Sequence, residues 1–145
     1  LTKSLAKMTV IDNMLLGAAE QKGESLRNAL LPSRWQKQEK QILKKAEDLL
    51  ERFKLSHMRD EYAATLSGGQ RKLLEMARAL MSEPKLILLD EPMAGVNPVL
   101  VESLLVHIEN LRDEGVSVLF IEHDMDAIMG ISDWIIVLAE GQVIA

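Results

Sequence analysis

The chain has 145 residues and a formal net charge of −5, from 17 Lys and Arg against 22 Asp and Glu. Hydrophobic residues make up 48% and charged residues 27%, which is typical of a folded globular chain and unlike a disordered one. The absence of cysteine excludes disulfides and thiolate metal sites. The apolar runs are as short as strands, below the roughly 18 residues that a membrane-spanning helix needs.

The charge is unevenly divided along the chain. Residues 1–65 carry 12 basic and 9 acidic side chains, a net +3, whereas residues 66–145 carry 5 and 13, a net −8. An acidic chain argues against broad, sequence-independent binding of nucleic acid, which needs clustered cations. The acidic half is compatible with a divalent-cation site or with a solvated acidic surface. Because the chain begins at Leu1 rather than Met, we expect a fragment of a longer protein.

The first half of the chain has helical periodicity. A short helix is predicted from Thr9 or Asp12, and a loosely patterned stretch follows over Gly23–Pro32. Residues 37–55 place apolar side chains at spacings of one, three and four, which predicts an amphipathic helix. Another helix is predicted to begin after Ser67. The first half is therefore expected to be all-helical.

The second half alternates strands with helices. Short apolar runs predict strands buried on both faces at residues 85–89 and 116–121, and a third strand at residues 134–139. Asn97-Pro98 supplies an N-cap and an N1 proline for the first connecting helix, Gly115 ends it, and a second helix runs through Ile131. A turn at Glu140-Gly141 precedes a last extended piece. This order predicts a parallel sheet with crossover helices.

A glycine pair lies at the predicted start of the helix after Ser67. Ser67 and Gln70 have the spacing of a capping box, a common way to begin a helix. Two glycines in the first turn are unusual, because each costs about 1 kcal/mol relative to alanine inside a helix. A phosphate bound to bare backbone N–H groups at the positive helix end explains the pair. Close helix packing is the alternative explanation.

Two polar clusters follow predicted strands. Asp90-Glu91 ends the first strand, and Glu122-His123-Asp124 ends the second. In parallel α/β sheets, ligands bind beyond the carboxyl ends of the strands. Adjacent carboxylates can hold Mg²⁺ and polarise a water molecule, and a histidine on a neighbouring strand can reach the same group. Solvated charges at strand ends are the alternative for either cluster alone.

These segments together resemble the ATP-binding-cassette (ABC) ATPase family. Leu66–Gln70 matches the family's signature motif, Leu86–Pro92 its Walker B strand with the catalytic glutamate, and Phe120–Asp124 its switch-histidine strand, at the family's spacings. The stretches Glu91–Pro98, Ile121–Met125 and Met129–Asp133 are also similar to ATPase subunits of branched-chain amino-acid importers. The long helical stretch between Asn13 and Arg59 looks like the longer of that importer's two ATPase subunits.

The resemblance implies an α/β fold made of a helical subdomain and the C-terminal part of a P-loop NTPase (RecA-like) parallel sheet with crossover helices. Residues 1–82 would form the helical, signature-motif subdomain. Residues 83–145 would form a partial RecA-like core with the Walker B and switch-histidine strands.

The resemblance also implies roles for the strand-end residues. Asp90 would bind Mg²⁺ through water, and Glu91 would orient and activate the attacking water. His123 would contact the γ-phosphate of ATP. Phosphoryl transfer depends mainly on positioning and charge stabilisation, so this division of labour is physically sensible.

For the signature motif, the resemblance implies a site shared between two subunits. Ser67, Gly68 and Gly69, with Gln70 alongside, would cradle the γ-phosphate of ATP held by the opposing subunit. Asn97 stands where many relatives carry an aspartate in the loop that crosses the dimer interface, so a charged contact there is not expected.

The resemblance further implies partners and a location. A second ATPase subunit, identical or different, would complete the nucleotide sites, and the segment around Thr2–Gly17 would lie against membrane permease subunits. The parent protein would bind ATP and Mg²⁺ at the cytoplasmic face of the plasma membrane, with no nucleic acid as partner.

The sequence lacks the phosphate-binding P-loop, Gly-x-x-x-x-Gly-Lys-Ser/Thr, because none of its eight glycines precedes a lysine. We therefore expect the 145-residue chain alone to be inactive towards ATP, and its apolar strand edges to cause low stability or association. Two other functions stay open. One is an ABC ATPase for another substrate or for non-transport work, and the other is a non-catalytic helical interaction module.

Overall fold

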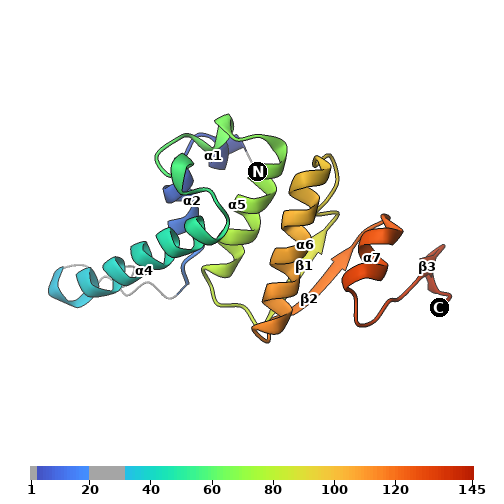
Figure 1. Cartoon of the computed structure of the whole chain (residues 1–145). Coiled ribbons are helices and arrows are strands. Elements are labelled where there is room, and N and C mark those ends of the chain that lie inside the picture. The colour runs from blue at the N-terminus through green and yellow to red at the C-terminus, as the bar shows by residue number, and fades with distance from the viewer. Residues whose placement is uncertain (1–2, 20–31) are drawn as a thin grey trace. The chain divides into compact units, whose positions relative to one another are not determined.

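A computed structural model describes residues 3–19 and 32–145 (Figure 1). The chain divides into two compact units, Leu1–Pro84 and Lys85–Ala145. The described part of the first unit is helical, and the second combines helices with strands. Residues 23–31 of the loosely patterned stretch Gly23–Pro32 lie outside the described residues. The assignment of residues 1–82 and 83–145 to two ABC ATPase subdomains stays a prediction.

The first unit contains four α-helices within its described residues: α1 (Lys3–Ala6), α2 (Val10–Leu15), α4 (Pro32–Arg52) and α5 (Gly68–Leu80). The short 3₁₀ turns η2 (Ser56–Met58) and η3 (Ala63–Thr65) connect α4 to α5. The predicted N-terminal helix is confirmed as α2, and Thr9 caps it by accepting a hydrogen bond from the Asp12 N–H at 3.1 Å. The helix predicted over residues 37–55 begins earlier, at Pro32, and ends where Lys54 takes a left-handed φ of 57°.

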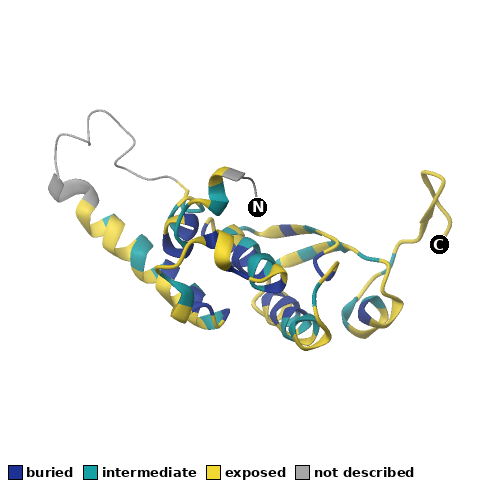
Figure 2. Cartoon of the chain, turned by 90° about the horizontal axis from the view of Figure 1, so that it is seen from above, coloured by how far each residue is buried: buried dark blue, intermediate teal, exposed yellow. Residues whose placement is uncertain are grey.

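The core of the first unit lies where α2, α4 and α5 pack on one another (Figure 2). Its most deeply buried apolar side chains are 1% exposed or less: Val10, Met14, Ala46, Leu50, Phe53, Leu55, Ala63, Leu74 and Ala77. Three of these residues, Ala46, Leu50 and Phe53, belong to the apolar stripe predicted from the sequence. Burial of that stripe explains why this polar, Lys- and Glu-rich segment is helical here.

The second unit is built on two parallel strands joined by a crossover helix. Strand β1 (Leu86–Asp90) leads to α6 (Pro98–Asp113), which returns the chain to β2 (Ser117–Ile121); α7 (Met125–Ile131) follows. The Asn97 side chain caps α6 by accepting a hydrogen bond from the Leu100 N–H at 3.0 Å. Gly115, just after the end of α6, takes a left-handed φ of 85°. The predicted strands, caps and parallel pairing of this segment are confirmed.

The two faces of this strand pair differ in burial. Ile87 is 5% exposed, whereas its neighbour Leu88 is 67% exposed, and on β2 Leu119 and Ile121 are 56% and 63% exposed. The prediction that both strands are buried on both faces is therefore wrong in this structure. Successive side chains point to opposite faces of a strand. Helix α6 packs against β2, and the alternate positions along both strands stay exposed.

The prediction of a third parallel strand at Trp134–Ala139 is also wrong. Residues 134–137 are not a strand, and Trp134 is 85% exposed. Instead β3 (Leu138–Ala139) pairs antiparallel with β4 (Gln142–Val143). The predicted turn is confirmed at Glu140-Gly141, whose φ values of 49° and 77° suit a two-residue hairpin turn. A strand needs a hydrogen-bonded neighbour, and in the described sheet β2 pairs with β1 alone, so this segment pairs with its own continuation.

Candidate functional site

The polar residues that follow β1 and β2 meet at one edge of the sheet. The parallel register sets Asp90 opposite Ile121, so the two strands end together. The Glu91 N–H donates to the Ile121 carbonyl at 3.0 Å and continues the ladder one step beyond β1. Asp90-Glu91 and Glu122-His123 therefore lie at neighbouring carboxyl ends, as the sequence predicts.

Glu91 has an unusual backbone conformation. Its φ of 44° lies in the left-handed region, which costs a non-glycine residue roughly 1 kcal/mol or more. The chain turns sharply there, and the Ala94 N–H donates back to the Glu91 carbonyl at 3.2 Å. Asp90 and Glu91 are both exposed, whereas Pro92 and Met93 are buried. The turn therefore exposes two adjacent carboxylates to solvent, while the two loop residues that follow them are buried.

Glu122 and His123 differ sharply in exposure. The Glu122 side chain is 1% exposed, and that of His123 is 79% exposed. Glu122 Oε1 accepts the Met93 N–H at 2.7 Å, and Oε2 accepts the His123 N–H at 3.3 Å. His123 Nδ1 lies 3.8 Å from Glu122 Oε2. The sequence predicts Glu122 only as a member of the polar cluster, with no separate role. Successive side chains of β2 alternate between an exposed and a more covered face, and this alternation is the signal that indicates the covered position of Glu122.

The signature motif forms the N-terminus of α5 in the first unit. Gln70 N–H donates to Ser67 Oγ at 3.3 Å, and Ser67 N–H donates to Gln70 Oε1 at 2.9 Å, so the predicted capping box is confirmed. Gly68 is exposed and Gly69 is buried. Arg71 Nη1 donates to the Leu66 carbonyl at 2.9 Å and holds the preceding loop. The signature motif belongs to the first unit, whereas Asp90, Glu91 and His123 belong to the second.

The donor chemistry at the end of β1 suits Mg²⁺. Asp90 and Glu91 offer carboxylate oxygens, which hard divalent cations prefer. Over residues 3–19 and 32–145, no group of three or more His, Cys, Asp or Glu side chains is arranged to hold a metal by itself. Mg²⁺ commonly takes one or two carboxylates and completes its shell with water and substrate phosphates, so these residues fit a nucleotide-bound ion.

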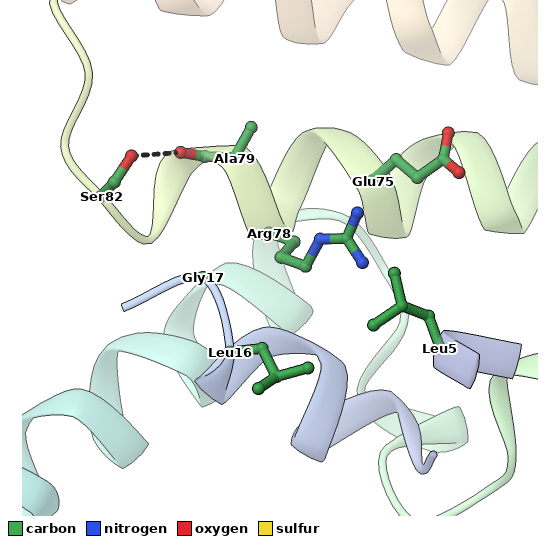
Figure 3. A pocket seen from close by; sticks show the side chains of 7 residues that line it. All are labelled: Leu5, Leu16, Gly17, Glu75, Arg78, Ala79 and Ser82. Carbon is green, nitrogen blue, oxygen red and sulfur yellow. Dashed lines mark hydrogen bonds between the residues drawn. The ribbon is translucent and has the colours of Figure 1, made fainter. Parts of the chain in front are cut away.

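The first unit also carries an open hollow of about 390 Å³ (Figure 3). It is lined by Leu5, Leu16, Gly17, Glu75, Arg78, Ala79 and Ser82. Residues from the N-terminal segment form one side and residues of α5 with Ser82 form the other. In the part of the chain that the structure covers, no helix combines the length and the apolar character that crossing a membrane requires.

The ends of two neighbouring parallel strands carry the paired carboxylates and the histidine, as the resemblance to ATP-binding-cassette ATPases implies. The family model described as "ABC transporter" matches residues 3–94. The chain belongs to the ABC transporter family, and the resemblance noted from its motifs is confirmed.

Two relatives illustrate the range of transport systems in which similar chains occur. The protein named "Probable branched-chain amino acid transport ATP-binding protein LivG" of Archaeoglobus fulgidus is 48% identical over 141 residues, which cover 97% of this chain and 54% of the relative. The "Lipopolysaccharide export system ATP-binding protein LptB" of Escherichia coli is 42% identical over 101 residues, 70% of this chain and 42% of that protein. The chain therefore spans about half the length of the relatives that it matches.

A solved structure supports the fold. A crystal structure of a nucleotide-free ATP-binding cassette from an ABC transporter aligns with a TM-score of 0.82 and 41% identity, over 100% of this chain and 57% of the other. The predicted fold class, a helical part followed by part of a P-loop NTPase parallel sheet, is thereby confirmed.

Proposed function

We propose that the protein containing this chain is the ATP-hydrolysing subunit of an ABC importer for branched-chain amino acids. The observation that carries the proposal is the meeting of Asp90-Glu91 with Glu122-His123 at the carboxyl ends of two paired parallel strands. The 48% identity with the LivG protein of A. fulgidus supports the substrate class.

In this proposal the strand-end residues act on the terminal phosphate of ATP. Asp90 would hold Mg²⁺ through water, and the ion would neutralise charge on the phosphates. Glu91 orients the attacking water and accepts its proton, and its exposed position above an anchored loop suits that role. His123, 79% exposed, contacts the γ-phosphate. These residues position groups and stabilise charge, which are the main requirements of phosphoryl transfer.

The signature residues serve a second subunit in this proposal. Ser67, Gly68, Gly69 and Gln70 form the capped N-terminus of α5, a 13-residue helix. The N–H groups of Gly68 and Gly69, which the capping box does not use, and the helix dipole favour a phosphate group. We propose that these four residues contact the γ-phosphate of ATP bound to the opposing ATPase subunit, in a homodimer or a heterodimer.

We further propose that the segment around Thr2–Gly17 docks on permease subunits at the cytoplasmic face of the plasma membrane. The open hollow lined by Leu5, Leu16 and Gly17 of this segment supports that placement. No nucleic-acid partner is proposed for this acidic chain.

The test of catalysis uses the full-length protein that contains this chain. We expect Glu91→Gln to lower its ATPase rate by about 100-fold, because the amide cannot accept a proton from water. Glu102→Gln, the same change at an exposed position on α6, should leave the rate unchanged. Equal rates for the wild type and Glu91→Gln would refute the proposed role of Glu91.

The 145-residue chain alone should show no ATPase activity above its own Glu91→Gln variant. It contains no glycine followed by lysine, so it lacks the P-loop cation that neutralises the β- and γ-phosphates. Phosphate release by the purified chain measures this directly. A P-loop elsewhere in the parent protein, which its gene sequence would reveal, would complete the nucleotide site.

The transported substrate needs a separate measurement. Uptake of Leu, Ile or Val with the cognate binding protein should depend on Glu91. Failure to move any of the three would favour the second candidate, an ABC ATPase for another substrate, which the 42% identity with the lipopolysaccharide-export protein LptB supports. A full-length protein without a P-loop would instead favour a non-catalytic helical interaction module.

A further inference from the structure

Glu122 links two parts of the second unit that are 29 residues apart in sequence. Its Oε1 accepts the Met93 N–H at 2.7 Å, the short distance typical of a charge-assisted hydrogen bond. Its Oε2 accepts the His123 N–H at 3.3 Å. The side chain is 1% exposed. Each carboxylate oxygen of this buried group therefore has a backbone donor, which offsets the cost of removing the charge from water.

The Met93 contact fixes the backbone on the far side of Glu91. The Glu91 N–H is already held by the Ile121 carbonyl at 3.0 Å, on the near side. Pro92 lies between these two anchored positions and has no N–H of its own. The backbone is therefore anchored on both sides of the Glu91 Cα atom. Glu91 has a φ of 44°, a conformation that persists only where its surroundings enforce it.

We propose that Glu122 is a positioning residue for ATP hydrolysis, whose buried carboxylate ties the loop after Glu91 to the strand end that carries His123. One side chain thus sets the direction of the proposed water-activating carboxylate and the backbone of the proposed phosphate-contacting histidine. The proposal rests on the function proposed above for Glu91 and His123.

A carboxylate is required at this position because both partners are donors. In Glu122→Gln one acceptor oxygen becomes an NH₂ group, so the side chain can no longer accept from both backbone N–H groups at once. Glu122→Asp keeps both oxygens but is one methylene shorter, so it cannot reach both donors. Both variants keep a polar side chain of similar size, and Glu102→Gln repeats the chemical change at an exposed site on α6.

The experiment combines amide hydrogen exchange with kinetics on the full-length protein that contains this chain. In Glu122→Gln we expect the Met93 amide to exchange at least ten-fold faster, while the Val116 amide, which donates to the Leu111 carbonyl at 2.9 Å, keeps its wild-type rate. We expect kcat for ATP hydrolysis to fall about ten-fold with KM for ATP changed less than two-fold, because ground-state binding is retained. Glu122→Asp should give an intermediate loss, and Glu102→Gln none.

The two readouts separate the two proposals. Unchanged Met93 exchange in both Glu122 variants would overturn the positioning role, whatever the kinetics. An unchanged kcat with faster Met93 exchange would overturn it as well, as would a rise in KM without a fall in kcat. If the Met93 amide is protected from exchange in the wild-type protein and that protein hydrolyses no ATP, the proposed function would be overturned instead.

Discussion

Asn13 is the most fully buried polar residue described in the first unit, with no exposed area. Its Nδ2 donates to the Leu5 and Thr9 carbonyls, each at 2.9 Å, and its Oδ1 accepts from Arg78 Nη1 at 3.4 Å. One side chain thus joins the end of α1, the start of α2 and the body of α5. A buried polar group is favourable only while such partners are in place.

We expect Asn13→Ala to lower the free energy of unfolding by about 2–3 kcal/mol, since buried partners lose their hydrogen bonds and a cavity forms. Urea denaturation of the full-length protein, followed by circular dichroism, measures the change. Asn110→Ala, at an exposed position on α6, should change stability by less than about 0.5 kcal/mol. Equal effects of the two substitutions would show that the Asn13 contacts contribute nothing.

Gly17 is required by close packing. A Cβ atom there would clash with the Arg78 carbonyl oxygen and lie 2.9 Å from Arg78 Cγ. We expect Gly17→Ala to destabilise the protein by about 1–3 kcal/mol, because backbone atoms must move apart. A Cβ atom added at Gly130 in α7 would meet nothing within 4 Å, so Gly130→Ala should be neutral or stabilise by up to about 1 kcal/mol. Thermal melting of both variants makes the comparison.

At the scale of elements, the start of α5 combines a structural and a proposed catalytic role. We expect Ser67→Ala to cost about 1 kcal/mol of stability through loss of the capping box. Thr9→Ala removes the N-cap of α2 and should cost a similar amount. In the full-length protein, only Ser67→Ala should lower the ATPase rate, by about ten-fold or more, as loss of one transition-state donor does.

Equal ATPase rates for the two cap variants would show that Ser67 acts only as a helix cap. A stability loss confined to Ser67→Ala would show that the Thr9 cap is not a matched control. The N-cap of α7, Asp124, is not used as a control because it adjoins His123.

Elements with local signals could be predicted from the sequence. The Ser67 capping box, the Asn97 N-cap with Pro98 and the Glu140-Gly141 turn all depend on residues within four positions of one another. The strand predicted at Trp134–Ala139 could not be judged locally, because a strand needs a partner along its edge. The same pattern of apolar residues serves a hairpin when no such partner is present.

The candidate site shows the same division between local and long-range information. Asp90, Glu91 and His123 could be found from motifs that lie within short segments. The contact of Glu122 with Met93 depends on the register of β1 and β2 and on the left-handed turn at Glu91. Neither is visible in a single sequence, so the partner of Glu122 could not be predicted.

At the scale of the whole molecule, exposed apolar area is concentrated in the second unit. One face of the strand pair carries Leu86, Leu88, Leu119 and Ile121, each more than half exposed, and Leu88 lies directly opposite Leu119 in the register. A contiguous apolar patch beside open strand edges favours association with other chains. The chain spans only 54% of its A. fulgidus relative, so we propose that further residues of the parent protein cover this face.

The exposed apolar face of β1 and β2 should make the isolated chain associate with itself. We expect the 145-residue chain to associate as its concentration rises, and the double substitution Leu88→Thr with Leu119→Thr to weaken that association because it removes the centre of the apolar patch. Val99→Thr with Val106→Thr changes two exposed positions on α6, 76% and 52% exposed, and should leave association unchanged. In the full-length protein, where we propose that further residues cover this face, the Leu88 and Leu119 pair should instead lower stability by several kcal/mol, because both leucines would be buried there. Sedimentation velocity of the chain and denaturation of the full-length protein measure the two effects, and a monodisperse wild-type chain at all concentrations would contradict the first.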